Sequence, residues 1–168
     1  MDLLTVLPLG SSRVTLRRAA EPDLPAIVGL LAADQLGATR DGVNTPEDLA
    51  AYQRAFRAID ADPAHLLVVG EAAVPQTPER VVATMQVSFL PGLARRGALR
   101  AQIEAVRVRD DFRGSGLGSA MFAWAIDEAR RRDCALVQLT TDKSRASAHR
   151  FYERLGFVAS HEGMKLAL

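Results

Sequence analysis

A glycine-rich hexapeptide, RGSGLG at residues 113–118, is the segment of this chain with the clearest chemical meaning. It follows a predicted strand that ends near Arg109 and opens a predicted helix. A glycine turn in that position lets main-chain N–H groups approach a phosphate closely, and the N-terminus of the helix adds unpaired donors and a positive dipole end. The hexapeptide therefore predicts a site for a phosphate-bearing cofactor.

Two familiar phosphate loops do not fit this segment. The nucleoside triphosphate loop needs a lysine and then a serine or threonine after its last glycine, whereas Ser119 and Ala120 stand there. The dinucleotide fingerprint spaces its glycines as GxGxxG, but Gly114, Gly116 and Gly118 are spaced GxGxG. A different class of phosphate-bearing ligand is indicated.

The composition limits the class of protein that carries this loop. A chain of 168 residues fits one domain, 1–168, and its single cysteine excludes an intramolecular disulfide. We expect no metal, because His65, His149 and His161 are far apart and no paired cysteines occur. With 21 basic and 20 acidic side chains the net charge is only +1, so we expect no nucleic-acid or membrane partner and a cytoplasmic location.

Hydrophobic periodicity and turn residues predict a mixed α/β order of elements. The connections between the second, third and fourth predicted strands are short and indicate an antiparallel meander, whereas a crossover helix makes the fifth strand parallel to the fourth. We predict strands at 13–18, 65–70, 80–90, 100–109 and 135–140, two short terminal strands around 161–163, and helices from Pro22, from Pro46 behind a Thr45 cap, at 116–132 and at 144–155.

At two motifs the sequence resembles the GNAT superfamily of acyl-coenzyme A dependent N-acyltransferases. The strand IEAVRVR with the loop DDFRGSGLG matches the family's RxxGxG signature at Arg113, Gly116 and Gly118. The segment AHRFYERLGF, residues 148–157, matches the family's penultimate helix and the strand after it. The order and separation of the two motifs make the resemblance specific, and it covers nearly all of the chain.

The resemblance implies a fold and a cofactor site. The fold is a mostly antiparallel central sheet of about seven strands with about four helices, and the sheet splays between its fourth and fifth strands. Acetyl-coenzyme A would lie in that cleft. The resemblance assigns its pantetheine arm to main-chain groups of Val106, Arg107 and Val108, and its pyrophosphate to N–H groups of Arg113, Gly114, Ser115, Gly116, Leu117, Gly118 and Ser119.

Acetyl transfer to an amine needs a proton acceptor, because only the neutral amine attacks the thioester. Glu104 is the candidate base: it stands in an otherwise apolar strand, where burial would raise the pKa of its carboxyl toward the working range. An ion pair with Arg95 or Arg96 is an equal alternative role for Glu104. A chain of water molecules is an alternative base.

Tyr152 is the candidate general acid, since its phenol has a basicity similar to that of the departing thiolate and its position matches the family's tyrosine. The alternative is a purely structural role in a core stripe with Phe151 and Leu155. Seven residues before the tyrosine, Arg145 replaces an asparagine common in the family, so a coenzyme A phosphate contact and a plain helix-surface arginine are both open. His149 and His161 are weaker candidates.

The predicted function is N-acetyl transfer from acetyl-coenzyme A to a primary amine of a small molecule or peptide, by direct attack in a ternary complex. The alternative is a noncatalytic module that binds or senses acyl-coenzyme A. The first two helices and the loop at 37–44 would line the acceptor side, but the charges there have both signs and do not choose an acceptor. The resemblance also implies that a homodimer is possible.

Overall fold

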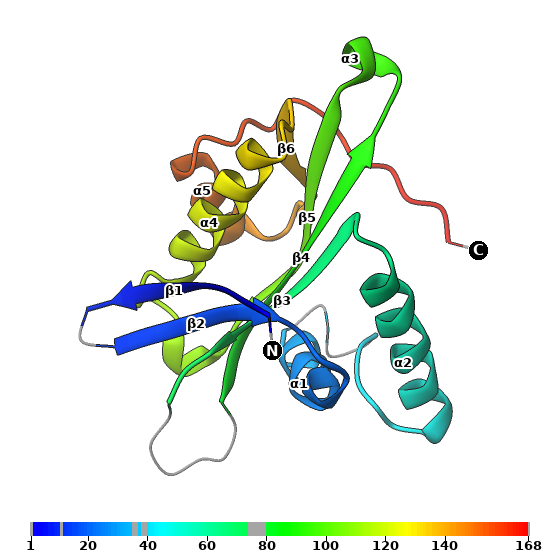
Figure 1. Cartoon of the computed structure of the whole chain (residues 1–168), viewed down its shortest axis with the longest axis vertical. Helices are drawn as coiled ribbons and strands as arrows, with labels where there is room; N and C mark the ends of the chain where they lie inside the picture. The colour runs from blue at the N-terminus through cyan, green and yellow to red at the C-terminus, as the bar shows by residue number, and fades with distance from the viewer. Residues whose placement is uncertain (1, 11, 35–36, 38–39, 74–79, 168) are drawn as a thin grey trace.

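The computed structural model describes residues 2–10, 12–34, 37, 40–73 and 80–167 (Figure 1). Within these residues one sheet has the strand order β1-β2-β3-β4-β5-β6. The first five strands are antiparallel to their neighbours, and β6 is parallel to β5, as predicted. The strands are β1 Leu3–Leu9, β2 Ser12–Arg18, β3 His65–Glu71, β4 Val81–Pro91, β5 Leu99–Val108 and β6 Leu136–Leu139.

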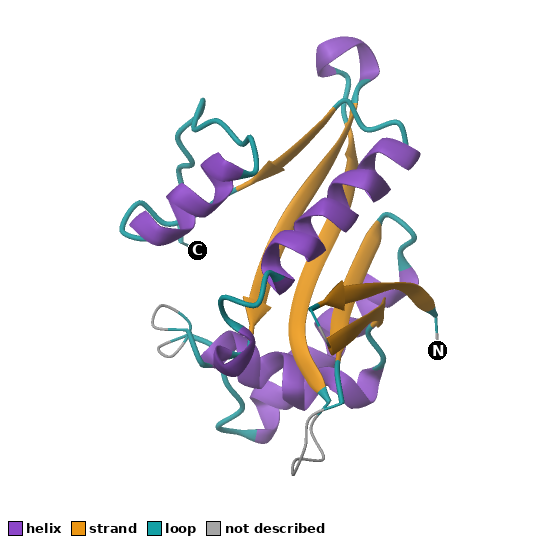
Figure 2. Cartoon of the chain, turned by 90° about the vertical axis from the view of Figure 1, so that its left-hand side faces the viewer, coloured by secondary structure: helices purple, strands orange, loops and turns teal. Residues whose placement is uncertain are grey.

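Helices cover both faces of the sheet (Figure 2). The helices α1 (Leu24–Ala32) and α2 (Pro46–Ala61) pack on one face, and α4 (Leu117–Arg131) crosses the other. The helix α5 (Ala146–Arg154) follows β6 at the edge of the molecule, and α3 (Ala94–Gly97) is a short turn between β4 and β5. No helix in the described ranges combines the length and apolarity needed to cross a membrane.

The helix α2 begins as the sequence predicts. The Thr45 hydroxyl accepts the N–H of Asp48 at 3.2 Å, while the Asp48 carboxylate accepts the N–H groups of Asn44 and Thr45, both at 2.9 Å. These bonds satisfy donors that the first turn of a helix leaves open, and Pro46 needs no partner for its nitrogen.

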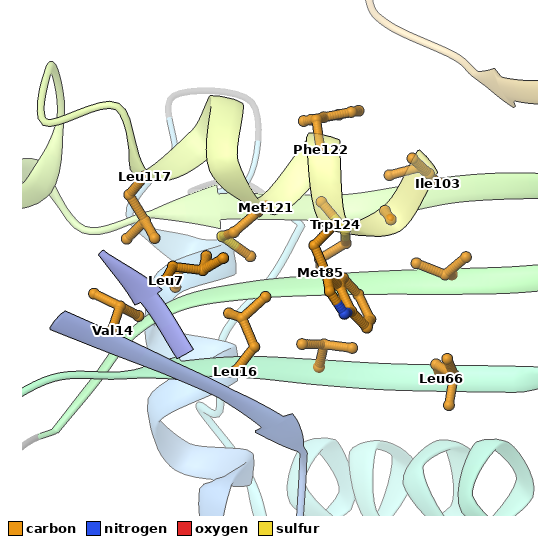
Figure 3. Close-up of a cluster of buried hydrophobic side chains, with 14 of the residues drawn as sticks. Leu7, Val14, Leu16, Leu66, Met85, Ile103, Leu117, Met121, Phe122 and Trp124 are labelled. Atoms are coloured by element: carbon orange, nitrogen blue, oxygen red, sulfur yellow. The ribbon is translucent and has the colours of Figure 1, made fainter. Parts of the chain in front are cut away.

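Two hydrophobic cores lie on opposite faces of the sheet. On one face the α4 side chains Met121, Phe122 and Trp124 pack against Leu16 and Met85 (Figure 3). On the other face α1 and α2 cover a smaller cluster that includes Ile27, Phe56, Val69 and Val81. Because β4 is covered on both faces, it reads as a nearly continuous apolar run instead of an alternating one.

A β-bulge in β5 shapes the cleft. Gln86 of β4 pairs with Glu104 and Thr84 pairs with Arg107, so one β4 residue lies opposite both Ala105 and Val106. Ala105 takes the left-handed backbone conformation, with φ at 53°. Because the β4 partners of Glu104 and Arg107 are two positions apart, the bulge brings these two side chains to the same face of the sheet.

The strands β5 and β6 splay apart, as the family resemblance implied. Their pairing covers only Arg100 to Ile103 on β5 and Leu136 to Leu139 on β6. Beyond Ile103 the bulged end of β5 continues without β6 beside it, while α4 and α5 lie on the far side of the opening (Figure 1).

Two features of the structure differ from the sequence-based expectations, and one expectation lies partly outside the described residues. The two terminal strands are wrong: residues 157–167 contain no strand, and Val158, Met164 and Leu166 are exposed there. The strand β1 was not predicted. It contains Pro8, and a proline is tolerated there because β1 lies at the edge of the sheet. Of the predicted loop at 37–44, residues 38–39 lie outside the described part of the chain.

A buried ion pair ties β2 to the turn before α1. The Arg17 guanidinium donates to both oxygens of Asp23, at 2.6 and 2.8 Å, and to Glu71 at 3.0 Å, with the Arg17 and Asp23 side chains only 9% and 11% exposed. Burial opposes ionisation of Asp23, but hydrogen bonds from Arg17 and from the Ala20 N–H outweigh it and lower the pKa of this carboxyl.

We expect Asp23→Asn to reduce the free energy of unfolding by about 3 kcal/mol, because it breaks the two-oxygen contact of a buried ion pair and leaves Glu71 as the one carboxylate that Arg17 contacts in the described residues. Urea denaturation measures this loss.

The loss should also depend on pH. Since the folded pKa of Asp23 is lowered, its stabilisation is present above about pH 4 and disappears as the pH falls below that value, so the free energies of unfolding of the wild type and the variant should become equal in acid. The control is Asp127→Asn in the exposed pair with Arg130, where we expect less than about 1 kcal/mol. Equal losses in the two variants would contradict the structural role of the buried pair.

Candidate active site

The cleft between the splayed strands brings together residues from β5, α4 and the α5 region. Its lining includes Glu104 and Arg107 from β5, Phe122 from α4, and Arg145 and Tyr152 from the α5 region. Both candidate proton-transfer residues thus line the same pocket. They come from segments about fifty residues apart in the sequence, and the splay of the sheet is what places them together.

Glu104 is exposed, which corrects the expectation that it is buried in its strand. The reason is that β6 pairs with β5 only as far as Ile103, so the strand leaves its neighbour at the residue before Glu104. The alternative ion pair with Arg95 or Arg96 is also absent among the described residues. What favours Glu104 as a base is therefore its access to the cleft.

Tyr152 is positioned by aromatic packing. Phe122 of α4 contacts the rings of Phe151, Tyr152 and Phe157 edge-on, with ring centroids 5.6, 5.5 and 6.0 Å from its own. Burial raises the pKa of the Tyr152 phenol, and the positive charges of Arg145 and Arg107 offset part of that rise. The phenol is therefore protonated at neutral pH, as a general acid must be.

The loop at 113–119 has two glycines whose backbone requires them. Gly114 and Gly116 have φ of 78° and 89°, and Gly116 is the residue that caps α4. The Ser115 hydroxyl donates to the Phe112 carbonyl at 2.7 Å and accepts the Leu117 N–H at 3.3 Å, which fixes the turn.

Not every N–H group of this loop is free to bind a phosphate. The Arg113 N–H donates to the Asp110 carbonyl at 3.1 Å, and the Ser115 N–H points to the Phe112 carbonyl at 3.4 Å. Within the described residues, four N–H groups have no acceptor: those of Gly114, Gly116, Gly118 and Ser119. The predicted set at 113–119 therefore contains a smaller group of available donors at the N-terminus of α4.

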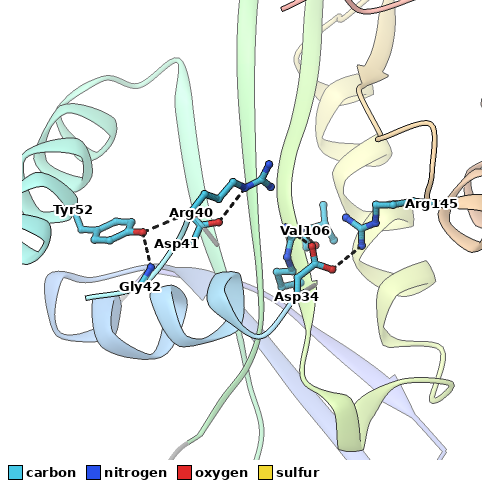
Figure 4. A network of polar contacts seen from close by, with 8 residues as sticks. Asp34, Arg40, Asp41, Gly42, Tyr52, Val106 and Arg145 are labelled. Carbon is cyan, nitrogen blue, oxygen red and sulfur yellow. Dashed lines mark hydrogen bonds and ion pairs between the residues drawn. The ribbon is translucent and has the colours of Figure 1, made fainter. Parts of the chain in front are cut away.

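A polar cluster that includes two arginines of the same pocket as Glu104 was not predicted as a whole (Figure 4). Asp34, just after α1, accepts hydrogen bonds from Arg107 at 3.4 Å and from Arg145 at 3.2 Å. Arg107 also donates to the carbonyl of its neighbour Val106 at 2.8 Å, a main-chain group that was assigned to the cofactor. A charged residue within the apolar strand IEAVRV was the one sequence signal for Arg107, and Asp34 gave none.

Four weaker candidates lie elsewhere. Arg95 and Arg96, the alternative partners considered for Glu104, are in α3 at the tip of the β4–β5 hairpin, at the opposite end of β5 from the glycine loop. The reason is that β4 and β5 stay paired as far as Pro91 and Leu99. The ring of His149 contacts the Asp142 carbonyl, and that of His161 contacts the Ser160 hydroxyl.

Comparison with known proteins gives a consistent result. The model of the GNAT acetyltransferase family matches residues 32–157. A glucosamine 6-phosphate N-acetyltransferase of Trypanosoma brucei brucei is 34% identical over 101 residues, which cover 60% of this chain and 67% of that enzyme. An aminoalkylphosphonate N-acetyltransferase of Salmonella typhimurium is 42% identical over 60 residues, but the match spans only 36% of this chain and 39% of that enzyme.

A solved structure extends the likeness to the whole fold. The crystal structure of a transcriptional regulator from Bacillus halodurans C-125 is 44% identical, with a TM-score of 0.83, and the match covers 92% of this chain and 99% of that one. The glycine loop, the splayed sheet and the family match all agree. The chain belongs to the GNAT acetyltransferase family.

Proposed function

We propose that this protein transfers the acetyl group of acetyl-coenzyme A to the primary amine of a small molecule, by direct attack within a ternary complex. The observation that carries the proposal is that Glu104 and Tyr152 line one cleft, and that β5, the strand of Glu104, leads into a loop with available N–H donors. The family match supports the reaction class, and the two curated relatives act on small amines, which supports the acceptor class.

The cofactor would be held mainly by backbone groups. The free N–H groups of Gly114, Gly116, Gly118 and Ser119, with the dipole of α4 behind them, suit the pyrophosphate. Main-chain groups of β5 at Val106, Arg107 and Val108 lie where β6 has diverged and suit the pantetheine arm. Acetyl-coenzyme A supplies the thioester, and the protein residues orient it and transfer protons.

Proton transfer would start at Glu104. Its carboxylate faces the cleft and takes the proton of the attacking amine, directly or through a water molecule. A backbone N–H, such as that of Val108, would stabilise the tetrahedral oxyanion. Tyr152 then donates its phenolic proton to the thiolate as the carbon–sulfur bond breaks, and solvent restores the protonation of both residues.

The experiment that tests the proposed function is release of free thiol from acetyl-coenzyme A in the presence of pooled amines: amino acids, polyamines, amino sugars and short peptides. We expect release above the amine-free background in at least one pool, with mass spectrometry showing the acetylated amine. Tight binding of acetyl-coenzyme A with no thiol release in any pool would contradict the proposal.

That negative result would favour the second candidate, a noncatalytic acyl-coenzyme A binding module. The similarity to a transcriptional regulator is the observation in its favour. Glu104 and Tyr152 separate the two, because a module that only binds the cofactor needs neither. Cytoplasmic location and a homodimer stay predictions.

We expect Glu104→Gln to lower kcat by about 10²-fold at neutral pH, because the amide cannot accept the proton of the amine. The Kd for acetyl-coenzyme A, measured by calorimetry, should not change. The matched control is Glu153→Gln, which makes the same substitution at an exposed position of α5 and should leave kcat within about twofold. If Glu104→Gln also leaves kcat intact, a water chain serves as the base.

A further inference from the structure

Two arginines on opposite sides of the cleft share a single carboxylate. Arg107 comes from β5 and Arg145 from the residue that caps α5, and each contacts a different oxygen of Asp34 (Figure 4). Asp34 and the Arg107 side chain are each only 13% exposed, while Arg145 is 36% exposed. The pocket lining itself includes both arginines but not Asp34.

Arg17 shows what a structurally satisfied buried arginine looks like in this protein. Two carboxylates, Asp23 and Glu71, serve its single charge at 2.6 to 3.0 Å, and they raise the pKa of the guanidinium despite its burial. At Arg107 the balance is reversed. Burial lowers the pKa of the Arg107 guanidinium, Asp34 compensates only in part, and Arg145 and Arg40 add further positive charge nearby.

The arginines of the cleft also retain donors. A guanidinium carries five N–H donors. The Nε atom of Arg107 is buried and has no hydrogen-bond partner in the described part of the chain. The Arg145 guanidinium donates there to Asp34 alone, at 3.2 Å, which is longer than the 2.7 to 2.9 Å usual for a charge-assisted bond.

The position of the pair relative to Glu104 suggests which ligand would use it. The bulge at Ala105 puts Arg107 on the same face as Glu104, opposite β4 residues that are two positions apart, which is a span of about 7 Å at 3.4 Å per residue. Asp34 follows α1, so this is the side of the cleft next to the end of α1, where the acceptor is expected.

We propose that Arg107 and Arg145 bind a phosphoryl or phosphonyl group on the acceptor amine, with Asp34 holding the two guanidinium groups in place. This inference rests on the proposed function, since it names the acceptor class of the same site. A dianion matches two guanidinium groups that share only one negative charge, and tetrahedral oxygens can accept from both. The acceptor's amine then lies on the Glu104 side.

The test compares acceptors built on matched skeletons. The first set is 2-aminoethylphosphonate, β-alanine and propylamine, and the second is glucosamine 6-phosphate with glucosamine. In the set whose skeleton fits the pocket, we expect kcat/KM to be highest for the acceptor with a phosphate or phosphonate group. It should be lower for the acceptor with a carboxylate and lowest for the acceptor with no acidic group, which is called the neutral acceptor below. A neutral amine that matches or exceeds its phosphorylated or phosphonylated counterpart in both sets would overturn the inference.

The variant that assigns the site is Arg145→Gln. We expect it to reduce kcat/KM for the anionic acceptor by about 10- to 100-fold, mainly through an increased KM. For the neutral counterpart, kcat/KM should change by less than about threefold. The control is Arg150→Gln, which removes the same charge from an exposed position of the same helix and should leave both values unchanged. Equal losses for anionic and neutral acceptors would show that Arg145 does not bind the anion.

A binding measurement separates this inference from the proposed reaction. Calorimetry of 2-aminoethylphosphonate and of glucosamine 6-phosphate with the coenzyme A complex should detect binding of at least one ligand in the wild type, weakened at least tenfold in Arg145→Gln. Anion binding of this kind without any acetylation would overturn the proposed acetyl transfer and support the anion site. Acetylation of neutral acceptors with no anion binding would support acetyl transfer and overturn the anion site. An increased Kd for acetyl-coenzyme A in Arg145→Gln would instead return Arg145 to the cofactor and overturn the inference.

Discussion

Replacing Tyr152 by phenylalanine is expected to lower kcat by about 10²- to 10³-fold at neutral pH. The substitution removes only the hydroxyl, so Phe122, Phe151 and Phe157 keep an aromatic neighbour and the fold is retained. What is lost is the proton for the departing thiolate, and general acid catalysis of this kind contributes about 10²- to 10⁴-fold. Steady-state thiol release with saturating acetyl-coenzyme A measures the effect.

Two controls accompany this variant. The Kd for acetyl-coenzyme A and the midpoint of urea denaturation should match those of the wild type. The raised pKa of the phenol also predicts that the wild-type kcat does not fall through loss of this proton until the pH is above about 10. If Tyr152→Phe turns over at the wild-type rate, then water donates the proton and the tyrosine is only part of the aromatic packing.

Replacing Phe122 by alanine is expected to destabilise the protein by about 3 to 5 kcal/mol and also to impair catalysis. Phe122 is 1% exposed and contacts three aromatic rings of the α5 region. Loss of its ring removes buried area and leaves a cavity, which is costly in a close-packed core. Because no residue of α5 is fully buried, this aromatic cluster is its main apolar attachment, and its loss frees Tyr152 to move.

The matched control is Phe56→Ala, which removes the same side chain from the core on the other face of the sheet. Urea denaturation should show a loss of similar size for both variants. At a temperature where both remain folded, only Phe122→Ala should reduce kcat by tenfold or more. Equal kcat values for the two would show that α5 is held in place without the cluster.

Most of the fold and the glycine turn at residues 113–118 could be predicted from the sequence, because their signals are local. Thr45 and Pro46 mark a helix start within a few residues, and Gly114 and Gly116 mark a turn that needs left-handed backbone. The order of elements then follows from short connections and one crossover helix. The β1 strand was missed and two terminal strands were wrongly predicted, because strand pairing depends on what lies beside a segment as well as on its own residues.

The polar side of the site could not be predicted for a different reason. Asp34 and Arg145 are 111 positions apart and meet only because the sheet and α1 place them there. The exposure of Glu104 depends on where β6 stops pairing, which strand composition does not reveal. The role of the Arg107 side chain was hidden by the bulge, since simple alternation along β5 puts it on the face opposite to Glu104.

The bulge at Ala105 also affects how substrate specificity can change among proteins of this shape. One inserted residue moves every later side chain of β5 to the opposite face of the sheet. An arginine can therefore be moved to or from the acceptor side without any substitution. An alignment that scores Arg107 as identical or different says nothing about which face it occupies. Acceptor preference in related chains should therefore be compared by strand pairing at this position, and a single-residue insertion or deletion there should count as heavily as the loss of a catalytic side chain.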